Sequence, residues 1–94
     1  MKNIMNIYFE SYMYIGKIEI NDDSSQYVVT ATTYNKYNGE KDIINSYHYY
    51  LSNAKNKQDE MLSIATKNDY ASVINKDEYD ILLFKIESKN KQIR

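Results

Sequence analysis

Residues 26–51 read QYVVTATTYNKYNGEKDIINSYHYYL, and this stretch decides the fold. From Gln26 to Tyr34 it is dense in Val and Thr, whose branched side chains pack well on a pleated surface. Asn38-Gly39 follows, and this dipeptide is a strong hairpin signal because a type I′ turn needs two residues that tolerate positive φ. Residues 42–51 then form the second strand of the hairpin, and their side chains alternate between its two faces. We therefore predict a β-hairpin with a type I′ turn at Asn38-Gly39.

The alternation of period two extends upstream of this hairpin. Side chains between Tyr12 and Ile20 alternate between an apolar face and a charged face, which is typical of a strand with one buried side. Gly16 interrupts the run and predicts a bulge or the close approach of another backbone. Residues 4–9 form a separate short strand or the start of one long bent strand. Residues 21–25 favour local hydrogen bonds and predict a turn.

Downstream of the hairpin the periodicity changes to that of a helix. Residues 52–67 carry an apolar stripe at helical spacing. We predict strands at 70–74 and 79–86, joined by a turn at 75–78. The expected fold class is α+β, with a single-layer antiparallel sheet of about five strands, one helix packed on one face, and the order ββ(β)αββ. One helix cannot cover both faces of such a sheet, so we expect the other face to show tyrosines.

Eleven of the 94 residues are tyrosines. A tyrosine combines a large apolar ring with a hydroxyl that needs water or a partner, and it gives a recognition surface contact area at low entropy cost. Eleven rings are more than a domain of this size can bury fully. The tyrosines that we expect to pack inside the sheet are Tyr12, Tyr14 and Tyr27. The tyrosines that we expect to meet a partner are Tyr34, Tyr37, Tyr47, Tyr49, Tyr70 and Tyr79.

Charge is distributed unevenly along the chain. Residues 1–84 hold eight Lys or Arg and twelve Asp or Glu, a balance of −4, whereas residues 85–94 hold four against one, a balance of +3. We expect one domain at 1–88 and a basic, frayed tail at 89–94. Carboxylates on loops can offer negative charge to a basic partner. The acidic residues that we expect to bind a partner are Asp22, Asp23, Asp77, Glu78 and Asp80.

The composition excludes several kinds of chemistry. The chain has no Cys, which rules out disulfides and sulfur ligands for zinc. With only two glycines it has no phosphate-binding Gly-rich loop. His48 is the only histidine and lies between tyrosines, and Asp77-x-x-Asp80 lacks the alternation of a calcium loop. We therefore predict no enzyme, no cofactor and no metal. The absence of a long apolar run predicts a cytoplasmic protein.

These features favour a non-catalytic interaction protein that binds a larger, basic protein or nucleoprotein complex through tyrosines and acidic loops. In size and composition, the chain resembles small phage and mobile-element proteins that inhibit host machinery, of which anti-CRISPR proteins are the best-known class. That resemblance implies an inhibitor of host defence acting in the host cytoplasm. If the partner binds nucleic acid and the acidic loops compete with the phosphate backbone for the same site, inhibition should weaken as the salt concentration rises.

Two alternatives remain open at this point. The tyrosine-rich hairpin and the basic tail together could bind single-stranded nucleic acid by stacking bases on rings. The exposed sheet face or edge could instead form a homodimer. Acidic residues beside the hairpin tyrosines favour a protein partner over nucleic acid.

Overall fold

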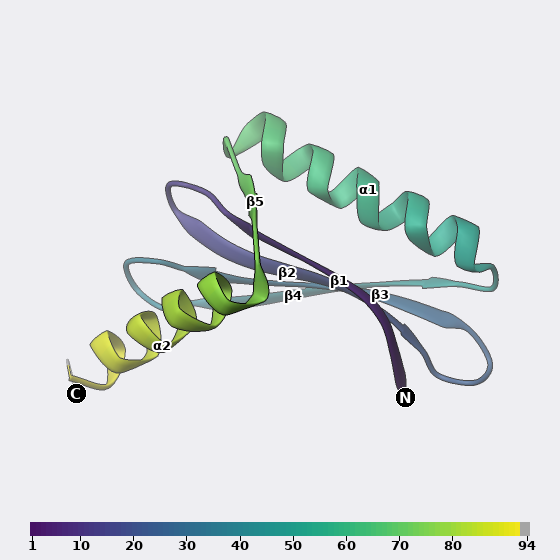
Figure 1. Ribbon diagram of the computed structural model, residues 1–94, viewed down its shortest axis with the longest axis horizontal. Coiled ribbons are helices and arrows are strands. Elements are labelled where there is room, and N and C mark those ends of the chain that lie inside the picture. The colour runs from purple at the N-terminus through teal and green to yellow at the C-terminus, as the bar shows by residue number, and fades with distance from the viewer. Residues whose placement is uncertain (93–94) are drawn as a thin grey trace.

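The computed structural model describes residues 1–92, which form a five-stranded antiparallel sheet and two helices (Figure 1). The elements in chain order are β1 (Lys2–Glu10), β2 (Tyr14–Asp22), β3 (Tyr27–Asn35), β4 (Lys41–His48), α1 (Leu51–Asn68), β5 (Ser72–Ile74) and α2 (Lys76–Gln92). The strands lie in the order β4-β3-β2-β1-β5. The first four form a meander, and α1 crosses the sheet to place β5 beside β1. The predicted α+β class and antiparallel sheet are confirmed.

The expected strand at 79–86 is wrong, because these residues lie inside α2. The turn predicted at 75–78 is the start of this helix. Asn75 Oδ1 accepts a hydrogen bond from the Glu78 N–H at 2.8 Å, and Asn75 Nδ2 donates to Glu78 Oε1 at 3.1 Å. This reciprocal pair resembles a capping box and satisfies the open end of a helix. Tyr79, Leu83 and Ile86 then repeat at helical spacing, and they pack on the sheet. The expected tail at 89–94 begins inside α2, and residues 93–94 lie outside the described residues.

The two helices lie on opposite faces of the sheet (Figure 1). On one face, Ala54 and Ala65 of α1 pack with Ile18 and Ile20 of β2. On the other face, α2 packs against Ile15 of the same strand. Because successive strand residues point to opposite faces, β2 contributes to both apolar clusters. None of the described helices is long and apolar enough to cross a membrane.

β1 and β2 pack closely at one cross-strand pair. Phe9 pairs with Gly16 across the two strands, and a β-carbon on Gly16 would overlap the Phe9 ring. The close approach predicted at Gly16 is therefore made by an aromatic side chain, and β2 has no bulge there. The ring covers the glycine and occupies the space that a side chain would fill.

The hairpin between β3 and β4 is confirmed, but its predicted type I′ turn is wrong. Gly39 has a φ of 73°, whereas Asn38 is not among the residues with positive φ. The Gly39 N–H donates to Asn35 O and the Asn35 N–H donates to Glu40 O, both at 2.9 Å. Gly39 and Glu40 therefore both oppose Asn35, which makes a β-bulge whose glycine has a left-handed backbone conformation. The longer turn projects Tyr37 from the end of the sheet.

Replacing Gly16 with alanine should lower the free energy of unfolding by about 1–3 kcal/mol, because the new methyl group overpacks against Phe9. Urea denaturation of both proteins measures the difference. In a Phe9→Leu background the same substitution should cost less, since the ring that causes the overlap is gone. Equal costs in the two backgrounds would contradict this explanation.

Candidate protein-interaction surface

The structure sorts the eleven tyrosines by exposure. Tyr79 is buried. Four rings are half-buried, namely Tyr8, Tyr14, Tyr27 and Tyr34. Six rings are at least half exposed, namely Tyr12, Tyr37, Tyr47, Tyr49, Tyr50 and Tyr70. Six large rings in water give this small domain an unusual amount of aromatic surface for contact with a partner.

Two tyrosine predictions are wrong in opposite directions. Tyr79 was expected to meet a partner, but only 3% of it is exposed, and its ring centroid lies 5.0 Å from that of Tyr8. Burial raises the pKa of Tyr79. Tyr12 was expected to pack in the sheet, but it lies in the loop before β2 and is 76% exposed. Tyr34 packs against the α2 cluster with one side of its ring near Lys41.

Exposed tyrosines come into contact at the end of the sheet where the β1–β2 and β3–β4 loops lie (Figure 1). The ring centroids of Tyr12 and Tyr37 are 6.2 Å apart, and Lys89 Nζ of α2 lies 5.9 Å from the centroid of Tyr37. Met13, between them in the chain, is also exposed. We call Tyr12, Met13, Tyr37 and Lys89 the hairpin-end surface. The nearby Tyr12 hydroxyl raises the pKa of Tyr37, so the Tyr37 hydroxyl stays neutral near pH 7.

Lys36 fixes the two loops to each other. Its backbone N–H donates to Met13 O at 2.8 Å, and its Nζ donates to Glu10 Oε2 at 2.7 Å and to Ser11 O at 2.9 Å. Asn35 Oδ1 accepts hydrogen bonds from the N–H groups of Tyr37 and Asn38. The loops that carry the exposed rings are therefore held in place before any partner binds. No feature of the sequence around Lys36 indicates this role.

Lys36→Ala should lower the free energy of unfolding by about 1 kcal/mol, because a partly shielded ion pair and a charged hydrogen bond are both lost. The matched control is Lys76→Ala. Lys76 also contacts a carboxylate at 2.7 Å, that of Asp80, but both side chains are more than half exposed. Solvent screens such a pair, so the control should change stability little. Equal losses in the two variants would show that burial of the Lys36 pair is unimportant.

Asp22 and Asp23 hold the turn between β2 and β3. Asp22 Oδ1 accepts a hydrogen bond from the Ser24 N–H at 2.9 Å, and Asp23 Oδ1 accepts one from the Gln26 N–H at 2.9 Å. These contacts support Ser24 at a φ of 83°. The Gln26 N–H also lowers the pKa of Asp23. Both carboxylates therefore stabilise the turn, and their contact with a partner remains a prediction.

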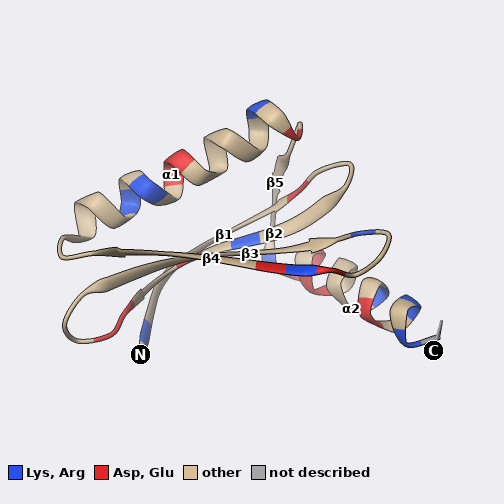
Figure 2. Ribbon diagram, turned by 180° about the vertical axis from the view of Figure 1, so that it is seen from behind, with Lys and Arg blue, Asp and Glu red and all other residues tan. Residues whose placement is uncertain are grey.

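The acidic residues at 77–80 belong to the first turns of α2. Asp77 and Glu78 lie where the helix dipole favours negative charge, and Asp80 pairs with Lys76. Figure 2 shows acidic and basic residues interspersed along α2 and at the start of β4. This mixture differs from the row of negative charge that would imitate a nucleic-acid backbone.

The stability of the fold should fall in acid partly through Asp23. Because its pKa is lower in the folded state than the ordinary 3.8, its stabilising contribution is fully present above that value. The contribution is lost as the pH falls through the lower folded value. Asp23→Asn should flatten the loss of unfolding free energy between about pH 5 and pH 2, measured by urea denaturation. An unchanged pH dependence would contradict a structural role for this carboxylate.

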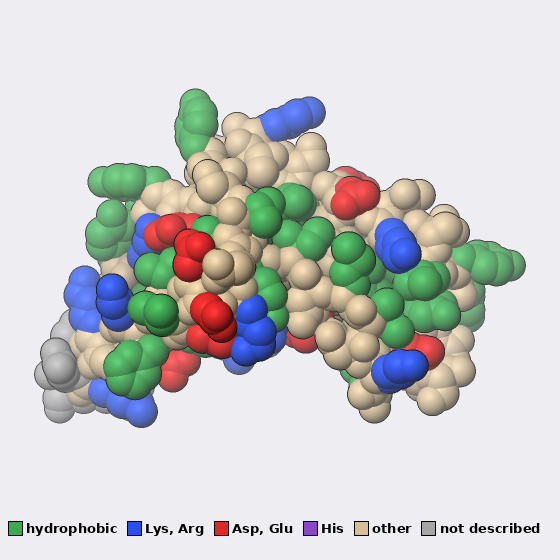
Figure 3. All heavy atoms as spheres, viewed as in Figure 1, with side chains coloured by type: hydrophobic (Ala, Val, Ile, Leu, Met, Phe, Trp, Pro, Cys, Tyr) green, Lys and Arg blue, Asp and Glu red, His purple; other side chains and the backbone are tan. Residues whose placement is uncertain are grey.

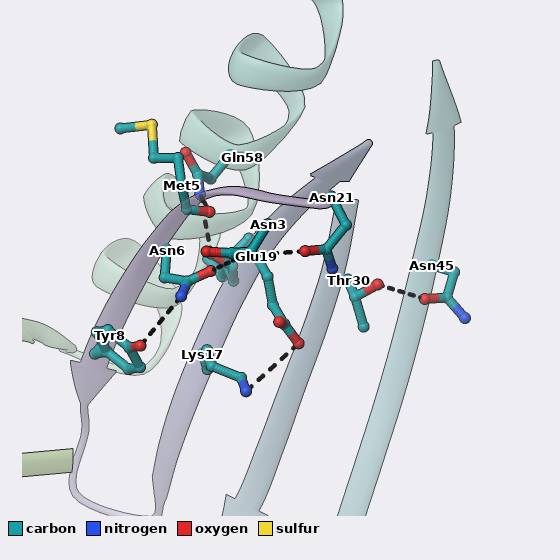
Figure 4. Close-up of polar contacts among 11 residues, drawn as sticks. Asn3, Met5, Asn6, Tyr8, Lys17, Glu19, Asn21, Thr30, Asn45 and Gln58 are labelled. Carbon is teal, nitrogen blue, oxygen red and sulfur yellow. Dashed lines mark hydrogen bonds and ion pairs between the residues drawn. The ribbon is translucent and has the colours of Figure 1, made fainter. Parts of the chain in front are cut away.

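The expected display of tyrosines on the sheet face away from α1 is reduced to one exposed ring, that of Tyr47. One end of that face is covered by α2, and the other carries amides and hydroxyls (Figure 4). Asn3 Nδ2 donates to Asn21 Oδ1 at 3.0 Å, and Thr30 Oγ1 donates to Asn45 Oδ1 at 2.8 Å. These groups satisfy one another, so the face resembles an ordinary solvated sheet surface.

Other exposed features are weaker candidates for a binding site. An open groove of about 670 Å³ lies on the α1 side of the hairpin end, lined by Phe9, Tyr14, Thr33, Asn35, Glu40, Lys41, Asp42 and Asp69. Ile81 and Phe84 project outward from α2, where Figure 3 shows apolar side chains at the surface. His48 contacts Ser46 Oγ through Nε2 at 2.7 Å. Within residues 1–92, no three His, Asp or Glu side chains gather where they could hold a metal ion.

Comparison of the chain with protein-family models, curated proteins and solved structures finds no match to any of them.

Proposed function

We propose that this chain is a non-catalytic interaction protein that binds a larger protein through the hairpin-end surface. The observation that supports this most is the pair of exposed rings, Tyr12 and Tyr37, on loops that Lys36 fixes together. Exposed aromatic side chains on fixed loops lose little entropy on binding, and Tyr is among the residues that contribute most at protein interfaces.

Within this class, the size and composition of the chain favour an inhibitor of host-defence machinery encoded by a phage or mobile element. The surface that we propose has one basic residue and two aromatic rings, so apolar contact should provide most of its affinity. Binding should then change little with ionic strength. A steep loss of binding with salt would favour the acidic loops as the binding element.

Tyr12→Ala and Tyr37→Ala should each weaken partner binding at least about tenfold, because each removes a central ring. The partner is first identified by crosslinking and affinity capture from the native host, and the affinity is then measured with purified proteins by calorimetry. The matched control is Tyr70→Asn, which removes the most exposed ring at a position with a φ of 53° that Asn tolerates. The control should bind like the wild type.

Unchanged affinity in both loop variants would contradict the proposal, as would a loss of binding in the Tyr70 variant alone. Thermal unfolding of each variant shows whether the fold is intact. All three substitutions lie at exposed positions, so their stabilities should be close to that of the wild type.

A single-stranded nucleic-acid binder is the second candidate. Lys89 beside Tyr37 and Lys41 beside Tyr34 place ammonium groups near two rings, and such pairs can stack a base and contact its phosphate. Because residues 85–92 belong to α2, deleting them would remove part of the helix. Fluorescence titration with oligonucleotides should therefore compare the wild type with Lys89→Glu. Binding at low salt that the substitution abolishes would favour this candidate.

A further inference from the structure

β4 has one open edge. Among the described residues β4 pairs with β3 alone, and it stands at the end of the strand order. The Asn35 N–H donates to Glu40 O, so alternation directs the backbone groups of even-numbered β4 residues toward β3. The N–H and C=O groups of Lys41, Ile43, Asn45 and Tyr47 therefore point to the open side. Such a row of donors and acceptors is a template for another strand.

The other free edges of the sheet are interrupted, whereas that of β4 is not. β5 is three residues long. The part of β1 beyond β5 has a bulge between Asn3 and Met5, and the Gln58 side chain donates to Met5 O at 3.5 Å. β4 pairs with β3 in unbroken register from Lys41 to His48, and its Ile43 and Ile44 are more than half exposed. Proteins usually protect an edge of this kind with charges, bulges or proline.

We propose that β4 pairs antiparallel with β4 of a second copy of the chain, about a two-fold axis that passes at Ile44. Two residues that oppose each other on paired strands point to the same face of the sheet. Odd-numbered residues of β4 must therefore oppose odd-numbered residues of the second copy. The opposed pairs are Lys41 with Tyr47, Asp42 with Ser46, Ile43 with Asn45, and Ile44 with itself. The result is one continuous ten-stranded sheet with both copies of α1 on the same face.

The charges and shapes of these pairs favour a second copy as the occupant. Lys41 Nζ lies 5.7 Å from the centroid of Tyr34, and pairing would bring Tyr47 of the second copy to its other side, where a second ring attracts the cation. Asp42 would meet the Ser46 hydroxyl, and Ile44 would meet an identical apolar side chain. No pair opposes like charges, which would destabilise the sheet. A net charge of −1 per copy gives little repulsion.

The expected association is weak. Strand pairing along one edge covers less surface than a standard protein interface, so the dissociation constant should be micromolar. The hairpin-end surface takes no part in this contact. The dimer therefore goes beyond the proposed function, and either proposal can fail without the other.

Sedimentation velocity on the full chain, from low to high micromolar concentration, tests the dimer. The wild type should pass from monomer to dimer over this range. Ile44→Lys should remain monomeric, because it opposes two like charges at the axis. The matched control is Ile64→Lys on α1, which is exposed to a similar extent and should dimerise like the wild type. A monomer at every concentration, or a dimer that survives Ile44→Lys, would overturn the proposal.

The register can be tested by disulfide formation, without background from native cysteines because the chain has none. Ile44 is a non-hydrogen-bonded position on the open side, where opposed Cα atoms lie close enough for a disulfide. Oxidised Ile44→Cys should run as a covalent dimer on a non-reducing gel, and Ile64→Cys should not. Crosslinking of Asn45→Cys in place of Ile44→Cys would overturn the stated register.

Discussion

The whole arrangement depends on a central strand that is apolar on both faces. β2 presents Ile18 and Ile20 to α1 and Ile15 to α2, and all three side chains are almost completely buried. A sheet with two such faces needs cover on both sides. Each helix covers only part of one face, because α1 lies over β2 to β4 and α2 lies at one end. The hairpin end remains in water, and the edge of β4 is open because β4 ends the strand order.

The sequence predicts the sheet well because its alternation is local and regular. The Val and Thr residues of β3 and the glycine near the following turn indicate a hairpin, and the structure contains it. The turn type was wrong because Asn35, outside the dipeptide, accepts hydrogen bonds from Tyr37 and Asn38 and lengthens the loop. The strand expected at 79–86 rests on apolar residues at both alternating faces of this segment. The signal that identifies the helix is Asn75 three residues before Glu78, at capping-box spacing.

Exposure of individual rings could not be predicted from alternation. Tyr79 is buried because its helix docks on the sheet beside Tyr8, and Tyr12 is exposed because β2 starts two residues after it. Asp22 and Asp23 lie at the predicted turn, whereas Asp77, Glu78 and Asp80 belong to the first turns of α2 and not to the predicted turn and strand. Their hydrogen bonds with nearby N–H groups depend on backbone geometry that a residue pattern does not specify. The bracing contact of Lys36 with Glu10 joins residues far apart in the chain, and no local pattern marks it.

Amide hydrogen exchange along β4 tests most directly whether this strand is an open edge. The N–H groups of Asp42, Ile44 and Ser46 should be protected at every protein concentration, because they face β3. Protection of Ile43, Asn45 and Tyr47 should be low in dilute solution and rise with concentration as a second strand covers them. Strong protection of all six amides in dilute solution, or none in the even-numbered set, would contradict an edge strand that is paired on one side and open on the other.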